Sequence, residues 1–91
     1  MDLKQILTDI ARAIVDTPDA VNVTENVDGD NVELILTVAE DDTGMVIGRH
    51  GKIAKAIRTV MKAAATSANL HVRVDILDYD ELSEAAPADE E

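Results

Sequence analysis

Gly48 and Gly51 enclose two nitrogen-rich side chains, Arg49 and His50, in the sequence VIGRHGK. Glycine adopts a positive φ readily and leaves room for another backbone to approach closely. A helical pattern begins at Lys52, so the positive, amide-rich end of that helix would face the same place. These residue types at this spacing predict a tight turn that lies against a chain of phosphates.

The charged residues are unevenly distributed along the chain. The 91 residues carry a formal net charge of −11, which taken alone argues against a nucleic-acid ligand. Between residues 43 and 74, however, there is no Asp or Glu, and five of the eight basic residues fall in one short window: Arg49, Lys52, Lys55, Arg58 and Lys62. The pattern predicts an acidic body with one basic stripe, which could attract an anionic ligand to one face.

Apolar spacing predicts the elements that precede this turn. Leu3 begins a run of helical period, with Asp2 as its N-cap, and the helix should end before Pro18. Alternating apolar residues at 21–24 and 32–38 predict two strands of an antiparallel hairpin whose apolar face meets that helix. Residues 40–43 are then expected to cap a short helix over residues 44–47, with acids at its positive end.

A longer helix should follow the turn, over residues 52–68. Its apolar face is expected to contain Ile53, Ala56 or Ile57, Val60, Met61 and Ala64. Residues 71–76 alternate and predict the last strand. Residues 78–91 are rich in Asp, Glu, Ala and Ser, a composition typical of a disordered acidic tail. We therefore expect one domain over residues 1–77 and a tail over residues 78–91.

Several function classes find no support in the residues. The chain has no Cys, so disulfides, thiolate metal sites and cysteine nucleophiles are excluded. The glycine spacing fits neither a Walker A motif nor a dinucleotide fingerprint, and His50 lacks a nucleophile or paired carboxylate nearby. We expect no enzymatic activity, catalytic residue, cofactor, metal or small-molecule substrate.

A start without signal-peptide character and the lack of a long apolar run predict a cytoplasmic protein that does not bind membranes.

The order helix-strand-strand-helix-helix-strand, with a glycine-bracketed turn between two helices, resembles the type II KH domain. The closest resemblance is to the small bacterial single-KH-domain proteins of the KhpA family. It extends over residues 3–76 and is most specific over residues 44–58. The resemblance implies an α+β fold in which the helices pack on one face of a three-stranded sheet.

The same resemblance implies single-stranded RNA binding, with the turn clamping about four backbone nucleotides. Gly48 and Gly51 would let the RNA strand approach, and Arg49 and His50 would project beside its phosphates. The remaining RNA-binding residues would be two lysines that reach the backbone and two isoleucines that form an apolar floor for the bases, namely Lys52, Lys55, Ile47 and Ile53. Ile35 is a weaker candidate for that floor, whereas Arg58 and Lys62 are expected to be solvated surface residues.

This sequence departs from the KH pattern in two places. Many KH domains have a large aliphatic residue three positions after the second glycine, where this chain has Ala54. The variable loop of the resemblance maps to residues 25–31, which are acidic and should repel phosphate. Both differences predict modest, weakly selective affinity for RNA.

Two functions from different classes remain open. The first is an RNA chaperone or post-transcriptional regulator with low sequence selectivity. For this function the resemblance implies a homodimer, or a heterodimer with a second KH-containing protein, and a role in cell shape and division. The second is a protein-interaction or dimerisation module in which the helix over residues 52–68 is the interface and RNA binding is incidental. The acidic tail could also fold back on the basic stripe and compete with RNA.

Overall fold

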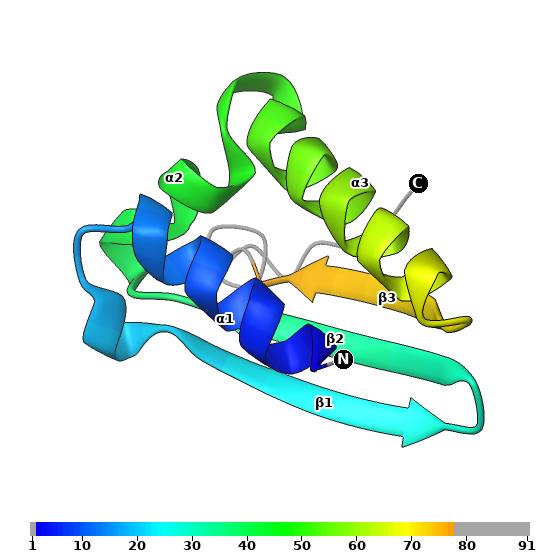
Figure 1. The fold of residues 1–91 in the computed structure, drawn as a ribbon. Coiled ribbons are helices and arrows are strands. Elements are labelled where there is room, and N and C mark those ends of the chain that lie inside the picture. The colour runs from blue at the N-terminus through cyan, green and yellow to red at the C-terminus, as the bar shows by residue number, and fades with distance from the viewer. Residues whose placement is uncertain (1, 78–91) are drawn as a thin grey trace, which may run out of the picture.

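Three helices cover one face of a three-stranded sheet in the computed structural model, which describes residues 2–77 (Figure 1). The sheet order is β1-β2-β3; β1 and β2 pair antiparallel, and β2 and β3 pair parallel. This α+β arrangement confirms the type II KH fold. The elements in chain order are α1 (Leu3–Ile14), β1 (Asn22–Asp28), β2 (Asn31–Thr37), α2 (Thr43–Ile47), α3 (Lys52–Ser67) and β3 (His71–Ile76).

Helix α1 forms as its sequence predicts. The Asp2 side chain accepts a hydrogen bond from the Gln5 backbone N–H at 3.1 Å, which satisfies one of the free donors of the first turn. Leu3, Leu7 and Ala11 recur at intervals of four residues and are buried against the sheet. The helix ends at Ile14, before the proline that would have stopped it.

The hairpin is longer than expected, because the predicted loop at residues 25–31 is almost entirely strand. Asp28 pairs with Asn31, so only Gly29 and Asp30 form the turn, and Gly29 has a φ of 62°. A two-residue turn fixes the register from its first pair, which keeps both strands paired up to the turn. The Asn26 side-chain amide donates to Glu33 across this part of the ladder at 3.4 Å. The expectation of an acidic variable loop here was therefore wrong.

The start of α2 also differs from the expectation. Asp42 is almost completely buried and makes no capping hydrogen bond to the helix. Its Oδ2 instead accepts a hydrogen bond from the Thr17 backbone N–H at 2.9 Å. Burial of a carboxylate is costly unless a donor compensates it, so this contact anchors the α1–β1 connection to the segment preceding α2.

The core lies between the helices and β2. Leu34 and Leu36 of the central strand are fully buried, and Met61 of α3 packs into the same cluster. Helix α3 buries Ala54, Ile57, Met61 and Ala65, whereas Ile53 and Val60, which were expected to face the core, are exposed. Small side chains at 54 and 65 let the helix lie close to the sheet. Within residues 2–77, no helix has both the length and the apolar character needed to cross a membrane.

Candidate nucleic-acid interface

The segment that joins α2 to α3 is a tight turn of residues 48–51, which we call the GRHG loop. The Gly48 N–H donates to the Gly44 carbonyl at 2.8 Å and ends α2, and the Gly51 N–H donates back to the Gly48 carbonyl at 3.1 Å. Gly48, His50 and Gly51 all have positive φ, at 79°, 58° and 72°. Such a concentration of left-handed backbone is uncommon and is found preferentially at functional turns.

The two glycines of the loop serve different purposes. A Cβ on Gly48 would lie 2.6 Å from Cγ1 of Ile53 and 2.9 Å from its backbone nitrogen, so the first glycine is required by the packing of the chain itself. A Cβ on Gly51 would meet no atom within 4 Å. The second glycine therefore leaves open space on the outer side of the loop, where another backbone can approach.

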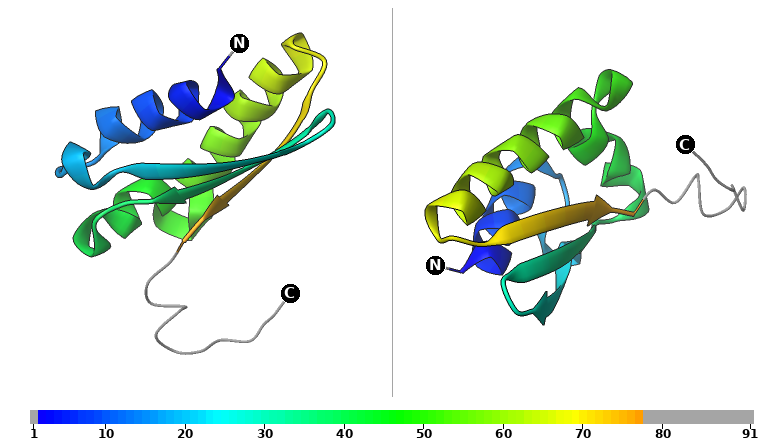
Figure 2. Two further views of the ribbon diagram at one scale, coloured as in Figure 1. Left: turned by 90° about the horizontal axis from the view of Figure 1, so that it is seen from below. Right: turned by 90° about the vertical axis from the view of Figure 1, so that its right-hand side faces the viewer.

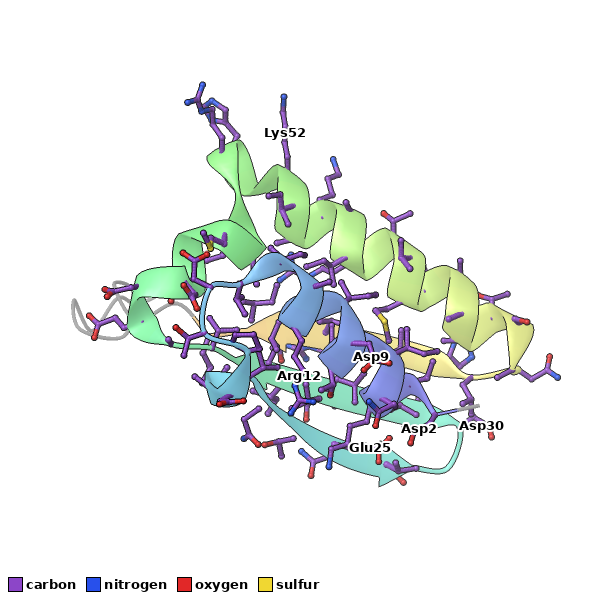
Figure 3. The ribbon with its side chains drawn as sticks, turned by 60° about the vertical axis from the view of Figure 1, so that its left-hand side comes forward. Asp2, Asp9, Arg12, Glu25, Asp30 and Lys52 are labelled. Atoms are coloured by element: carbon purple, nitrogen blue, oxygen red, sulfur yellow. The ribbon has the colours of Figure 1, made fainter. Side chains whose placement is uncertain are left out.

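The polar side chains of the loop extend away from the protein. Arg49 and His50 are exposed, and Lys52, in the first turn of α3, points outward from the top of that helix in Figure 3. No ion pair or hydrogen bond of these three side chains occurs among the described residues. The loop thus presents its basic side chains on one exposed edge, at the positive end of α3.

Helix α3 carries a row of cations along one side. Lys55, Arg58 and Lys62 are spaced by three and four residues and form what we call the basic flank. Arg58 Nε donates a hydrogen bond to the Val74 carbonyl at 3.0 Å, which places this flank next to β3. Arg58 is exposed, as expected of a surface residue, and this hydrogen bond in addition anchors it to the edge strand of the sheet.

A groove lies between the basic flank and β3. It is lined by Arg58, Lys62, Arg73 and Asp75, with Val72 and Val74 contributing apolar surface. Arg73 was not identified from the sequence, since its place in the groove depends on β3 being the strand beside α3. The alternation of apolar and polar residues in β3 does not reveal which helix or strand lies beside it.

Replacing Arg58 by methionine should lower the free energy of unfolding by about 1 kcal/mol, because the Val74 carbonyl loses its hydrogen-bond donor while the aliphatic stem is retained. Urea denaturation followed by circular dichroism measures this. The matched control is Lys62→Met on the same flank, which removes no hydrogen bond within residues 2–77. Equal effects of the two substitutions would show that the bond contributes nothing measurable.

The apolar candidates do not all lie together. Ile47 is half-buried immediately before the loop, and Ile53 is exposed beside Gly48. Two residues along an α-helix differ by about 200° in direction, so Ile53 and Lys55 project from nearly opposite sides of α3.

Ala54 is buried in the core, so its small side chain does not affect an exposed groove. Ile35 alternates with the buried Leu34 and Leu36 and lies on the sheet face away from the helices, which contradicts its assignment to the floor.

The acidic hairpin turn is remote from the GRHG loop. The Asp30 carbonyl accepts a hydrogen bond from the N–H of His71, which follows the C-terminal end of α3. Sixteen residues of helix separate that end from the loop, a length of about 24 Å. Figure 3 shows Lys52 at the opposite end of the molecule from Asp30 and Glu25. Residues 25–31 are therefore too far from the GRHG loop to repel a phosphate bound there, contrary to the expectation from the sequence.

Comparison with known proteins identifies the relatives of this chain. A family model described as "KhpA/KhpB, KH domain" matches residues 4–76. The RNA-binding protein KhpA of Clostridium acetobutylicum is 51% identical over 75 residues, which cover 82% of this chain and 100% of that protein. The RNA-binding protein KhpA of Halalkalibacterium halodurans is 47% identical over 76 residues, covering 84% of this chain and 100% of that protein. The RNA-binding protein KhpA of Treponema pallidum is 41% identical over 76 residues, which cover 82% of this chain and 94% of that protein.

Proposed function

This chain belongs to the KhpA/KhpB family of KH domains, and from that premise we propose that it binds single-stranded RNA through the GRHG loop. We further propose that it acts in the cytoplasm as an RNA chaperone or post-transcriptional regulator, with cell shape and division among the processes affected. The observation that carries the proposal is the exposed loop with open space beside Gly51 at the positive end of α3.

Each residue of the proposed site has a distinct role. The RNA backbone passes beside Gly51, where no side chain intervenes, and Arg49 and His50 contact its phosphates from the loop. Lys52 and Lys55, in the first turns of α3, extend the phosphate contacts along the helix. Ile47 and Ile53 supply apolar surface next to Gly48 for the bases.

Low sequence selectivity follows from the kind of contact. Phosphate contacts position a nucleic acid without reading its bases. The only aromatic residue of the chain is Tyr79, outside the described residues, so the proposed site has no aromatic platform for stacking. Binding would then depend chiefly on charge and on the accessible single-stranded backbone.

The test of this function is the salt dependence of RNA binding by the full chain, measured by fluorescence anisotropy with a labelled single-stranded RNA. Contacts to about four nucleotides predict a slope of log K against log salt on the order of −2 to −3. The matched control is the same RNA annealed to its complement, which should bind more weakly because the loop grips one unpaired backbone. Absence of binding at low salt, or a slope near zero, would contradict the proposal.

A second candidate function, dimerisation, is favoured by an apolar band on α3. Ile53 and Val60 remain 38% and 52% exposed, and the exposed Ala56 and Ala63 lie between and beside them. We call these four residues the apolar flank. Small residues allow close approach of a second helix, which could belong to another copy or to a second KH-containing protein. The apolar flank and the basic flank project from different sides of α3, so a dimer would leave the cations of the basic flank free, whereas Ile53 would be shared between the two functions.

Substitution Val60→Asp should weaken self-association by about tenfold or more, because a carboxylate would be buried without a partner at the centre of the apolar flank. Sedimentation equilibrium over a range of protein concentrations measures the dissociation constant. Thr59→Asp introduces the same charge one position away, about 100° around the helix, and should have little effect. A wild-type protein that is monomeric at high concentration would exclude the dimer.

A further inference from the structure

The basic groove has an excess of positive charge that the described domain does not neutralise. Among residues 2–77 the one ion pair is Arg73–Asp75, at 3.5 Å and on exposed side chains. Lys55, Arg58 and Lys62 have no carboxylate within ion-pair distance in this part of the chain. The groove can therefore attract an anion from elsewhere.

The rest of the chain supplies such anions in a concentrated form. Residues 78–91 contain seven acids and no Lys or Arg, namely Asp78, Asp80, Glu81, Glu84, Asp89, Glu90 and Glu91. This segment lies outside the family match, which ends at residue 76. Two of the relatives described above are matched over their whole length by 75 and 76 residues. The acidic segment is therefore an addition to the domain that these relatives share with this chain.

The fold places the origin of this segment close to the groove. The last backbone contact of the sheet is from the Leu77 N–H to the Leu36 carbonyl at 3.1 Å. Three residues join α3 to β3, and the two elements pack together, so β3 returns toward the end of α3 that carries the GRHG loop (Figures 1 and 2). Residue 78 thus follows a strand that forms one wall of the groove.

The length of the segment is sufficient to reach every cation of the groove. Fourteen residues can span at most about 50 Å, whereas the whole of α3 extends over about 24 Å. Individual exposed ion pairs contribute little to stability. Several ion pairs within one chain form at an effective concentration in the millimolar range. Their contributions therefore add, and together they can hold the segment in the groove.

We propose that the carboxylates of residues 78–91 bind the groove of Arg58, Lys62 and Arg73, together with Lys55, in the same chain and compete there with RNA. The competitive part rests on the proposed function, whereas the intrachain contact does not. Lys55 belongs to both sites, so RNA must displace the carboxylates before its phosphates contact Lys55 and the neighbouring groove. The segment would thereby reject weakly held polyanions and confine binding to strands that also engage the GRHG loop.

The intrachain contact is tested without RNA, on the full chain. In one variant the seven acids become Asn or Gln, and amide spectra of ¹⁵N-labelled protein are compared with wild type at low salt. We expect shift differences concentrated at Lys55, Arg58, Lys62 and Arg73 that disappear near 0.5 M salt, where the screening length is only a few ångströms. Combining Arg58→Gln and Lys62→Gln with either tail should abolish the differences, whereas Lys4→Gln with Arg12→Gln should not. Differences that are absent, or spread evenly over the domain, would overturn the proposal.

The competition is tested by RNA affinity of the same full-length pair. Neutralising the seven acids should tighten binding about three- to tenfold at low salt, with the two proteins converging at high salt. Unchanged affinity together with a positive spectral result would overturn the competition while retaining the contact. If neither protein binds RNA, the proposed function fails, and the amide spectra still decide whether the segment occupies the groove.

Discussion

Replacing Arg49 and His50 by aspartate is expected to weaken RNA binding by about tenfold or more at low salt, a change of at least about 1.4 kcal/mol. The Arg49 guanidinium and the His50 imidazole, which contact phosphate, are lost, and two carboxylates take positions where they repel it. The fold should be retained, because both side chains are exposed. His50 has a φ of 58°, a conformation that aspartate also tolerates better than most residues. Anisotropy with a labelled single-stranded RNA measures the affinity.

The control for this variant must carry the same change in charge at another site. Lys4→Asp combined with Arg12→Gln alters the net charge at neutral pH by the same amount and affects only exposed residues of α1. Figure 3 places Arg12 far from Lys52. The control should bind nearly as well as wild type. Equal losses in both variants would mean that RNA responds to overall charge and that the GRHG loop has no special part.

Substitution of Gly48 by alanine should destabilise the domain by about 2–4 kcal/mol and lower its melting temperature by about 10 °C or more. The backbone at φ 79° and ψ 173° belongs to a region that is essentially reserved for glycine. The new methyl group would also approach Ile53 to 2.6 Å at Cγ1 and 2.8 Å at Cβ. Truncating Ile53 to alanine cannot relieve the clash, because its Cβ and backbone nitrogen remain. Thermal unfolding followed by circular dichroism measures the effect.

Gly51→Ala tests whether the two glycines of the loop have different roles. Its φ of 72° and ψ of 15° are left-handed helical values, which cost a non-glycine residue about 1 kcal/mol, and its Cβ would meet no neighbour. We expect a smaller loss of stability than for Gly48→Ala, accompanied by weaker RNA binding, since a methyl group then occupies the approach to the loop. Greater destabilisation by Gly51→Ala than by Gly48→Ala would contradict the steric analysis.

Much of the fold could be predicted because its signals are local. The N-cap at Asp2, the alternation that ends in Leu34 and Leu36, and the start of a helix at Lys52 each depend on a few neighbouring residues. The order of these elements, with two glycines between two helices, was enough to predict a type II KH fold. The positions of Gly48 and Gly51 in a turn of positive φ follow from the same local chemistry.

The features that could not be predicted depend on contacts between distant segments. Helix α3 has apolar residues on more than one side, and periodicity alone did not reveal that Ala54 and Ala65 face the sheet while Val60 faces solvent. Arg58 bonds to Val74, sixteen residues away, and Asp42 bonds to Thr17, twenty-five residues away. The length of the hairpin depends on the register between β1 and β2, which the sequence of either strand alone does not reveal.

The most direct test of the central claim is to map where single-stranded RNA contacts the full-length protein. Amide spectra of the ¹⁵N-labelled chain are recorded during titration with a short single-stranded RNA. We predict that the largest shifts occur at Arg49, His50, Gly51, Lys52 and Lys55, and that they saturate together with a single dissociation constant. Shifts confined to the sheet face away from the helices, or their absence at saturating RNA, would contradict the assignment of the GRHG loop as the RNA-binding site.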